Sequence, residues 1–168
     1  MDRLFRIRVI TFVWLLIPLG LLVAAPAWLR DVAHEAGPAH WGIAQWIGAW
    51  LMINGVGLMG WCVYLFNVVG QGTPVPWEAP QRFVLSGPYR FVRNPMALGA
   101  LMLLAGQALA FQSRTGGMYT LIAGCAAWAL IRCVEEPQLR RRYGQNYADY
   151  CREVPRWMPR LPERRKSN

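Results

Sequence analysis

Residues 95–134 read PMALGALMLLAGQALAFQSRTGGMYTLIAGCAAWALIRCV. The stretch holds two apolar runs, 95–111 and 117–134, joined by a short polar segment. At 1.5 Å per residue, each run forms a helix about 26 Å long, close to the roughly 30 Å hydrocarbon core of a bilayer. Because the link is short, the sequence predicts an antiparallel hairpin of two membrane-spanning helices.

Two further apolar runs precede the hairpin, at residues 9–28 and 43–69, and both are long enough to span a bilayer. A loop, 70–94, and a tail, 135–168, complete the chain. We therefore expect an all-α integral membrane protein that forms a single domain over residues 1–168. It would have four transmembrane helices, of which the last two form a hairpin, and a C-terminal interfacial amphipathic helix.

The first apolar run has a second interpretation. Three arginines precede it, and Ala25-Pro26-Ala27 has the small-x-small form of a signal-peptidase site. The run is about twenty residues, which is long for a signal peptide and sufficient for a span. We expect it to be retained as a helix, and a cleaved signal peptide is the alternative.

Composition and charge agree with a membrane protein. The 168 residues are 55% hydrophobic and 16% charged, with 18 Lys and Arg against nine Asp and Glu, a net charge of +9. Such a composition excludes a disordered chain. With the N-terminus in the cytoplasm, only Arg30 and Arg114 would lie outside, as the positive-inside rule requires. The charge then indicates topology and contact with lipid headgroups, not nucleic acid. It predicts an integral protein, in a bacterial inner membrane, with both termini cytoplasmic.

The sequence offers no metal or redox site. None of the four cysteines forms a C-x-x-C pair, so a zinc site or redox dithiol has no support. His34 and His40 lie in a short polar segment with no cysteine nearby. We interpret the cysteines as small apolar fillers and the histidines as loop residues.

Within the spans, a few residues are expected to serve packing. Gly55, Gly57 and Gly60 would permit close helix contact. Asn54 and Gln107 are polar groups at membrane depth and should pair across helices.

The first motif with chemical potential covers residues 85–95, LSGPYRFVRNP. Gly87-Pro88 predicts a turn, and Asn94-Pro95 predicts a helix N-cap followed by proline at the first helical position. The free N–H groups of that helix end lie next to Arg93 and could hold an anionic ligand group. The alternative is a capped helix whose arginine reaches lipid phosphates.

The second motif is RCVEEP, residues 132–137. Since Pro137 lacks an N–H, we expect the fourth span to end here and a new helix to begin. Glu135 and Glu136 would sit at its start, where carboxylates are favoured by the helix dipole. Two adjacent carboxylates at an interface also suit a cationic ligand such as a sulfonium or an amine. The following helix has one apolar face, which predicts that it lies on the bilayer; the face comprises Leu139, Tyr143, Tyr147, Tyr150 and Val154.

These motifs resemble blocks of the isoprenylcysteine carboxyl methyltransferase and phospholipid methyltransferase family. The blocks are GTPVP at 72–76, GPYRFVRNP at 87–95, EEPQL at 135–139 and YGQNYADYCREVPR at 143–156. Each is weak by itself, but their order and spacing are fairly specific. The resemblance covers roughly residues 70–160.

The resemblance implies an integral membrane methyltransferase that uses S-adenosylmethionine, bound between the loop before the third span and the segment after the fourth. Arg93 would help to fix the loop, and Glu136 could act as a base for a protonated nucleophile; these are the catalytic candidates. The methyl group would leave by direct in-line displacement, with positioning as the main device. The cofactor-binding candidates are Gln81, Arg82, Phe83, Val84, Tyr89, Asn94, Pro95, Met96 and Glu135.

The chain departs from the family pattern at three positions. Asn94 stands where many members have His, although Asn is common in bacterial relatives. Ala97 replaces a tyrosine that would form one wall of the pocket. Ile131 replaces the substrate-binding arginine of the prenylcysteine enzymes, and Arg132 next to it is our candidate for substrate contact. These departures argue against a prenylcysteine substrate.

We therefore expect a lipophilic or membrane-associated small-molecule acceptor, reached between the helices, with membrane lipids as the surroundings and with no nucleic acid or metal partner. The sequence predicts neither the acceptor atom nor the oligomeric state. One alternative is an NADPH-dependent reductase of the sterol-reductase-related type, against which the Arg93-Asn94-Pro95 form and the number of spans argue. The other is a non-enzymatic membrane scaffold whose motifs only cap helices.

Overall fold

The computed structural model describes residues 20–69 and 86–158, and the regular structure in these ranges is helical. The all-α prediction is therefore confirmed for this part of the chain. The elements in order are η1 (Gly20–Ala24), α2 (Ala25–Val32), α3 (Ile43–Val68), η3 (Gly87–Arg90), α4 (Pro95–Ala110), α5 (Arg114–Leu130), η4 (Ile131–Glu135) and α6 (Glu136–Glu153).

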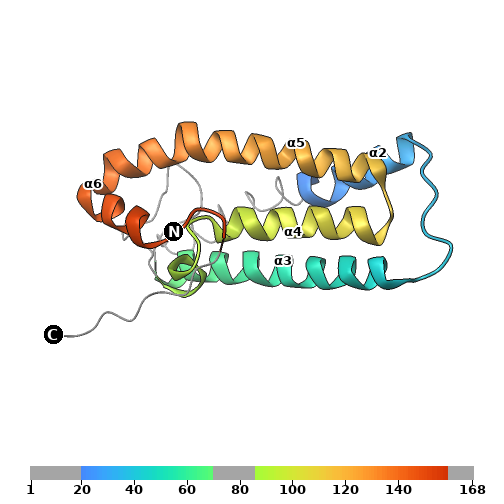
Figure 1. Cartoon of the computed structure of the whole chain (residues 1–168), viewed down its shortest axis with the longest axis horizontal. Helices are drawn as coiled ribbons and strands as arrows, with labels where there is room; N and C mark the ends of the chain where they lie inside the picture. Colours follow the sequence, from blue (N-terminus) through green and yellow to red (C-terminus); the bar gives the residue numbers. More distant parts are fainter. Residues whose placement is uncertain (1–19, 70–85, 159–168) are drawn as a thin grey trace, which may run out of the picture.

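Helices α3, α4 and α5 lie side by side, with α4 between the other two (Figure 1). Neighbouring helices run in opposite directions, so the predicted hairpin of α4 and α5 is confirmed (Figure 1). The turn between them is tight because Ser113 caps α5, its hydroxyl accepting from the N–H of Gly116 at 2.8 Å. This topology brings the end of α3, η3, the start of α4 and α6 to one end of the bundle.

Glycines bring α3 and α4 into backbone contact. A Cβ added at Gly55 would lie 2.6 Å from the carbonyl oxygen of Gly99, and one added at Gly106 would lie 2.6 Å from that of Gly48. The expectation for Gly55 is confirmed, whereas a Cβ added at Gly57 or Gly60 meets nothing within 4 Å among the described residues, so close helix contact at those two positions stays a prediction. Those two glycines face away from α4.

The two polar groups within the helices behave differently. Gln107 donates to the carbonyl of Leu22 at 2.6 Å and so pairs across elements, as expected. Asn54 instead donates to the carbonyl of Trp50 in its own helix, at 2.8 Å. The amide of Asn54 is on an outward face, where the i−4 carbonyl is within reach.

Within residues 20–69 and 86–158, two helical stretches are long and apolar enough to cross a membrane: Ile43–Val68, and Arg114–Glu153, which joins α5, η4 and α6. α4, with 16 residues, is a shorter apolar helix. Large apolar side chains cover the outward faces of both long stretches, among them Trp50, Ile53, Leu121 and Ile122. Most of the first expected span, 9–28, lies outside the described residues.

A separate element, α6, begins at Glu136 as predicted, but the chain does not leave the helical conformation at Pro137. The π-helical turn η4 directly precedes α6 and lets the helix continue from Arg114 to Glu153. At this turn the N–H of Glu136 donates to the carbonyl of Ile131, five residues back, which is the hydrogen bond of a π turn. The break lies instead at Gly144, whose φ of 53° and ψ of −126° are accessible to glycine. Beyond it the chain turns back toward η3 and α4 (Figure 1).

The apolar face of α6 is present as predicted, but it is buried in the protein. Tyr147, Tyr150 and Val154 form a buried cluster, against which Leu139, Tyr143 and Cys151 pack. Because the chain folds back at Gly144, this face meets the segment before α4, and the Tyr150 hydroxyl donates to the carbonyl of Tyr89 at 2.7 Å. The helix therefore closes the end of the bundle with this part of its apolar face.

Candidate functional site

The short helix η3 presents Tyr89 at the end of α3. Gly87 has a φ of 59°, and a Cβ there would lie 2.8 Å from Cδ1 of Leu65, so the turn requires glycine. The ring of Tyr89 packs edge-on against Phe66, with 5.6 Å between centroids. The predicted Gly87-Pro88 turn is thus confirmed, and it positions the Tyr89 ring against Phe66 of α3.

The Tyr89 hydroxyl is neutral at physiological pH. Burial raises its pKa well above the ordinary value of a tyrosine, and the nearby Cys62 thiol and the charge of Glu135 raise this pKa further. The Glu135 side chain is itself exposed, and within the described residues it takes part in no ion pair or hydrogen bond.

Arg93 joins the start of α4 to the segment after α6. Its Nε donates to the carbonyl of Val154 at 2.8 Å, and its Nη1 lies 3.2 Å from Oε1 of Glu136 and 3.3 Å from Sγ of Cys151. Its backbone N–H donates to the carbonyl of Pro155 at 3.0 Å. The side chain is 14% exposed, so Arg93 is a largely buried connector.

Glu136 is enclosed by two guanidinium groups. Besides Arg93, Arg156 binds it through both oxygens, with Nε 2.7 Å from Oε1 and Nη2 2.9 Å from Oε2. This pairing with Glu136 raises the pKa of Arg156. The Glu136 side chain is only 8% exposed. Because guanidinium donors occupy both carboxylate oxygens, the geometry favours a positioning role for Glu136.

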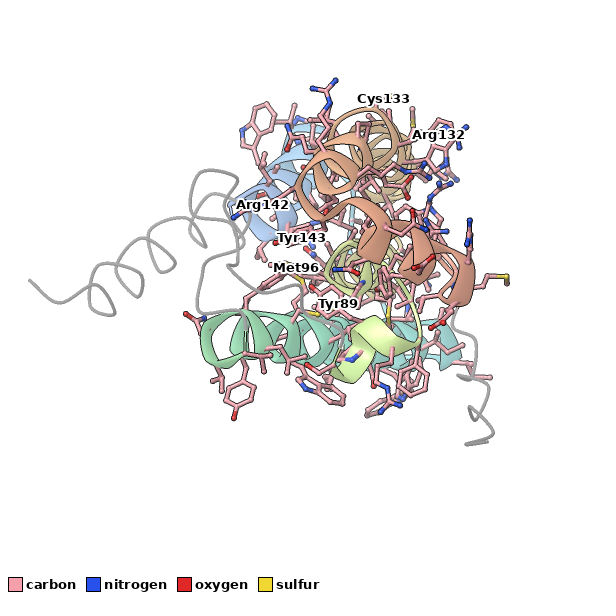
Figure 2. All side chains as sticks on the ribbon, turned by 90° about the vertical axis from the view of Figure 1, so that its left-hand side faces the viewer. Tyr89, Met96, Arg132, Cys133, Arg142 and Tyr143 are labelled. Carbon is pink, nitrogen blue, oxygen red and sulfur yellow. The ribbon has the colours of Figure 1, made fainter. Side chains whose placement is uncertain are left out.

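Asn94 occupies the predicted N-cap position of α4, with Pro95 at the start of the helix, but its side chain makes no capping bond. Its Nδ2 is buried and has no hydrogen-bond partner among the described residues. Figure 2 shows Met96 and Tyr89 on one side of the bundle end, below Tyr143 and Arg142 of α6. The unused donor and the free N–H groups of α4 thus belong to the same end of the molecule as Tyr89.

Other predicted residues are not brought to this group. Arg132 and Cys133 project from the far side of the long helix, away from Tyr89 and Met96 (Figure 2). The Arg132 guanidinium lies over the Trp128 ring, 5.7 Å from its centroid. Residues 81–84, four of the expected cofactor contacts, lie outside the described residues. Their roles, like that of Arg132, stay predictions.

Two hollows occur at the opposite end of the bundle. One, of about 220 Å³, lies among α2, α3, α4 and α5 and is lined mainly by apolar groups, with Gln107 and Arg30 at its border. The other, of about 610 Å³, is more open and lies beside the segment that connects α2 to α3. Neither includes a candidate site residue.

Comparison with known families gives the deciding observation. The model of the phospholipid methyltransferase family matches residues 43–146, from the start of α3 into α6. The chain belongs to the phospholipid methyltransferase family. The match includes η3, the start of α4 and the two glutamates, which are the elements that form the candidate site.

Two methyltransferases are similar to this chain. Methanethiol S-methyltransferase 2 of Bradyrhizobium diazoefficiens is 30% identical over 139 residues, which cover 73% of this chain and 51% of that protein. Phosphatidylethanolamine N-methyltransferase of Malassezia globosa is 35% identical over 65 residues, covering 39% of this chain and 7% of that protein. The chain thus spans about half the length of the first relative and much less of the second. No solved structure matches it.

Family membership also bears on the apolar helices. Buried apolar helices of soluble proteins pass the same length test, but only 17% of the most apolar window of α3 and 6% of that in Arg114–Glu153 are buried. Together with the family, these outward apolar faces identify a membrane protein.

Sequence reasoning missed several residues that build the site. The resemblance assigns no role to Arg156, although this residue binds Glu136 through both carboxylate oxygens. The sequence predicts Cys62 and Cys151 to be small apolar fillers, yet Cys62 interacts with the Tyr89 hydroxyl and Cys151 accepts from Arg93. A Val-Pro-Arg motif that follows an apolar helix face was the available signal for Arg156. Nothing in the local sequence pointed to either cysteine.

Proposed function

We propose that this member of the phospholipid methyltransferase family transfers a methyl group from S-adenosylmethionine to a lipophilic or membrane-associated small molecule at the cytoplasmic face. One observation carries the proposal: the exposed carboxylate of Glu135, which has no ion pair or hydrogen bond among the described residues, belongs to the bundle end where α4 begins and contributes to the raised pKa of Tyr89. The family favours this function over a reductase or a scaffold.

The residues fit the cofactor by charge. S-adenosylmethionine carries an ammonium group, a sulfonium and a carboxylate. Glu135 would attract a cationic group of the cofactor, and the Asn94 amide with the free N–H groups of α4 would receive its carboxylate. The buried Nδ2 of Asn94, which has no partner among the described residues, supports this assignment, since such a donor is costly unless a ligand satisfies it. Pro95, Met96 and residues 81–84 would complete the pocket.

When bound, the cofactor supplies an activated methyl group, which an in-line displacement moves from sulfur to the nucleophile. The acceptor atom gains the bond to carbon, and the electron pair of the broken S–C bond remains on the sulfur. The protein's part is then to orient both partners and to exclude water. Arg93 and Glu136 would hold two parts of the site in place, the loop before α4 and the acidic turn that carries Glu135 and Glu136. Tyr89 would donate a hydrogen bond as a neutral phenol.

We propose that the acceptor reaches this end of the bundle through the bilayer. The names of the relatives support a lipophilic or volatile acceptor, since they specify methanethiol and phosphatidylethanolamine. Arg132, on the outer surface of the long helix, would contact a lipid phosphate or the polar head of the acceptor.

The proposal includes the membrane arrangement. Four spans would cross the bilayer, including residues 9–28, with the N-terminus, the segment 70–94 and the segment after 135 on the cytoplasmic side. The run from Arg114 to Val134 is about 31 Å long as a helix, close to the hydrocarbon thickness, which supports an interfacial position for Glu135.

Titration of the full chain in detergent by calorimetry tests the function. We expect saturable binding of S-adenosylmethionine and none of NADPH, followed by transfer of a labelled methyl group to methanethiol or to phosphatidylethanolamine vesicles. Binding of NADPH alone would support the reductase instead. Binding of neither compound would overturn an enzymatic function of this site.

A further inference from the structure

The segment that follows α6 crosses the start of α4 through contacts of Arg93. The backbone N–H and Nε of this arginine bind the carbonyls of Pro155 at 3.0 Å and Val154 at 2.8 Å. These are contacts between residues about sixty positions apart in the chain. The short segment 154–156 is therefore held against the start of α4 by hydrogen bonds from Arg93.

The same segment delivers Arg156 to Glu136. The two bonds, at 2.7 and 2.9 Å, form a bidentate pair, the most directional contact a guanidinium makes with a carboxylate. The Glu136 side chain is 8% exposed and that of Arg156 is 26% exposed, so the pair is screened from solvent. Since Arg93 also binds Glu136 at 3.2 Å, the carboxylate would keep a cationic partner if Arg156 were lost.

The pairing of Glu136 affects its neighbour. Successive residues on a helix project about 100° apart, so a Glu136 held inward directs Glu135 outward. The two glutamates stand at the junction of η4 and α6, and a π turn is a less regular hydrogen-bonded structure than an α-helix. Without an anchor, rotation of this turn would carry Glu135 away from Tyr89.

We propose that Arg156 is a positioning residue whose bidentate bond to Glu136 latches the segment 154–156 to the acidic turn and holds Glu135 in the orientation that receives the cofactor. The inference rests on the cofactor site proposed above. It adds to that site a residue that touches neither cofactor nor acceptor.

The test compares Arg156→Gln with Arg152→Gln in the full chain in detergent. Arg152 is a matched control, because it is an exposed arginine at the end of α6, paired with the exposed Asp149. We expect Arg156→Gln to weaken S-adenosylmethionine binding at least tenfold and Arg152→Gln to leave it within twofold. Arg156→Lys, which keeps the charge but not the fork, should restore part of the affinity.

Two further readouts separate positioning from general stability. The KM for S-adenosylmethionine should rise in Arg156→Gln, while kcat at saturation stays within about threefold. Hydrogen exchange without ligand should become faster at residues 131–137 and stay unchanged in the α3–α4 interface. Faster exchange throughout the chain would mark a general loss of stability and overturn the proposal.

Equal affinity and equal exchange in Arg156→Gln and Arg152→Gln would also overturn it. If the wild-type chain binds no S-adenosylmethionine, the proposed function fails. The bond between Arg156 and Glu136 as an anchor of the acidic turn is then tested by hydrogen exchange alone. Faster exchange at 131–137 in Arg156→Gln alone supports the latch in that case, and no difference between the two variants overturns it.

Discussion

Glu135 and Glu136 are neighbours in the chain with opposite surroundings. Glu135 is exposed and unpaired within the described part of the chain, whereas Glu136 is buried between Arg93 and Arg156. A carboxylate that is already paired contributes to structure, while a free one near an open helix end can bind a cation. The sequence motif alone could not distinguish them, because the partner of Glu136 lies twenty residues further along.

Removal of the Glu135 carboxylate should therefore weaken cofactor binding without disrupting the fold. We expect Glu135→Ala to weaken S-adenosylmethionine binding at least tenfold, about 1.4 kcal/mol, with membrane insertion unchanged. Calorimetry on the purified chain measures this. Asp149→Ala removes an exposed carboxylate of α6 and should change nothing. Equal affinities in these two variants would contradict the role of Glu135.

Arg93 differs from Glu135 because it connects the start of α4 to α6 and the segment after it. Arg93→Ala removes the side-chain bonds to Val154, Glu136 and Cys151 and should loosen the start of α4. We expect at least a tenfold loss of S-adenosylmethionine affinity, about 1.4 kcal/mol, with the chain still inserted. Arg90→Ala, which removes an exposed arginine of η3, is the control. An unchanged dissociation constant in Arg93→Ala would remove Arg93 from the site.

At the scale of elements, the α3–α4 contact depends on glycines. In Gly106→Ala the new Cβ would lie 2.6 Å from the Gly48 carbonyl oxygen and 2.7 Å from Cγ of Met52, so the helices must separate. We expect a loss of roughly 1–3 kcal/mol of stability, the usual cost of overpacking. Gly57→Ala, whose added Cβ meets no atom of the described residues within 4 Å, should leave the α3–α4 contact and the stability unchanged. Thermal unfolding in detergent compares the two, and equal midpoints would contradict the close contact.

Glu35 ties the segment after α2 to the start of α5. Its carboxylate accepts from the Ser113 hydroxyl at 2.5 Å and from the Thr115 N–H at 2.9 Å, and these bonds hold its pKa below the ordinary 4.5. A lowered pKa means that the stabilisation is complete above the unfolded-state pKa and is lost as the pH falls through the folded-state value.

We therefore expect the wild-type chain to be more stable than Glu35→Gln at pH 7. The difference between their unfolding midpoints should shrink as the pH is lowered below about 4.5, because protonation then removes the same interaction. Thermal unfolding in detergent at several pH values measures this. A difference that is constant from pH 7 to pH 3 would contradict the role of the ionised carboxylate.

Sequence patterns predicted elements better than their contacts. The hairpin, the Gly87-Pro88 turn and the apolar face of α6 follow from local hydropathy and from glycine and proline chemistry. The chain stays helical through Pro137, which directly follows the π turn η4 and Glu136. The helix breaks instead at Gly144, whose positive φ is accessible to glycine. Which glycines face α4 depends on the rotation of α3, and the partner of Glu136 depends on where the chain returns. Neither the rotation of α3 nor the return of the chain to Glu136 can be predicted from a few consecutive residues.

For the whole molecule, orientation decides which side of the membrane the site faces. Sixteen of the 18 Lys and Arg residues fall in segments that would be cytoplasmic, and only Arg30 and Arg114 would lie outside. Moving so many charges across the bilayer is unfavourable, so the end that carries η3, Glu135 and Arg156 should face the cytoplasm. Reporter fusions after Gln112 and after Asn168 test this, with a periplasmic signal expected at the first and a cytoplasmic one at the second. A periplasmic signal after Asn168 would place the candidate site on the outside and contradict the cytoplasmic position of the reaction.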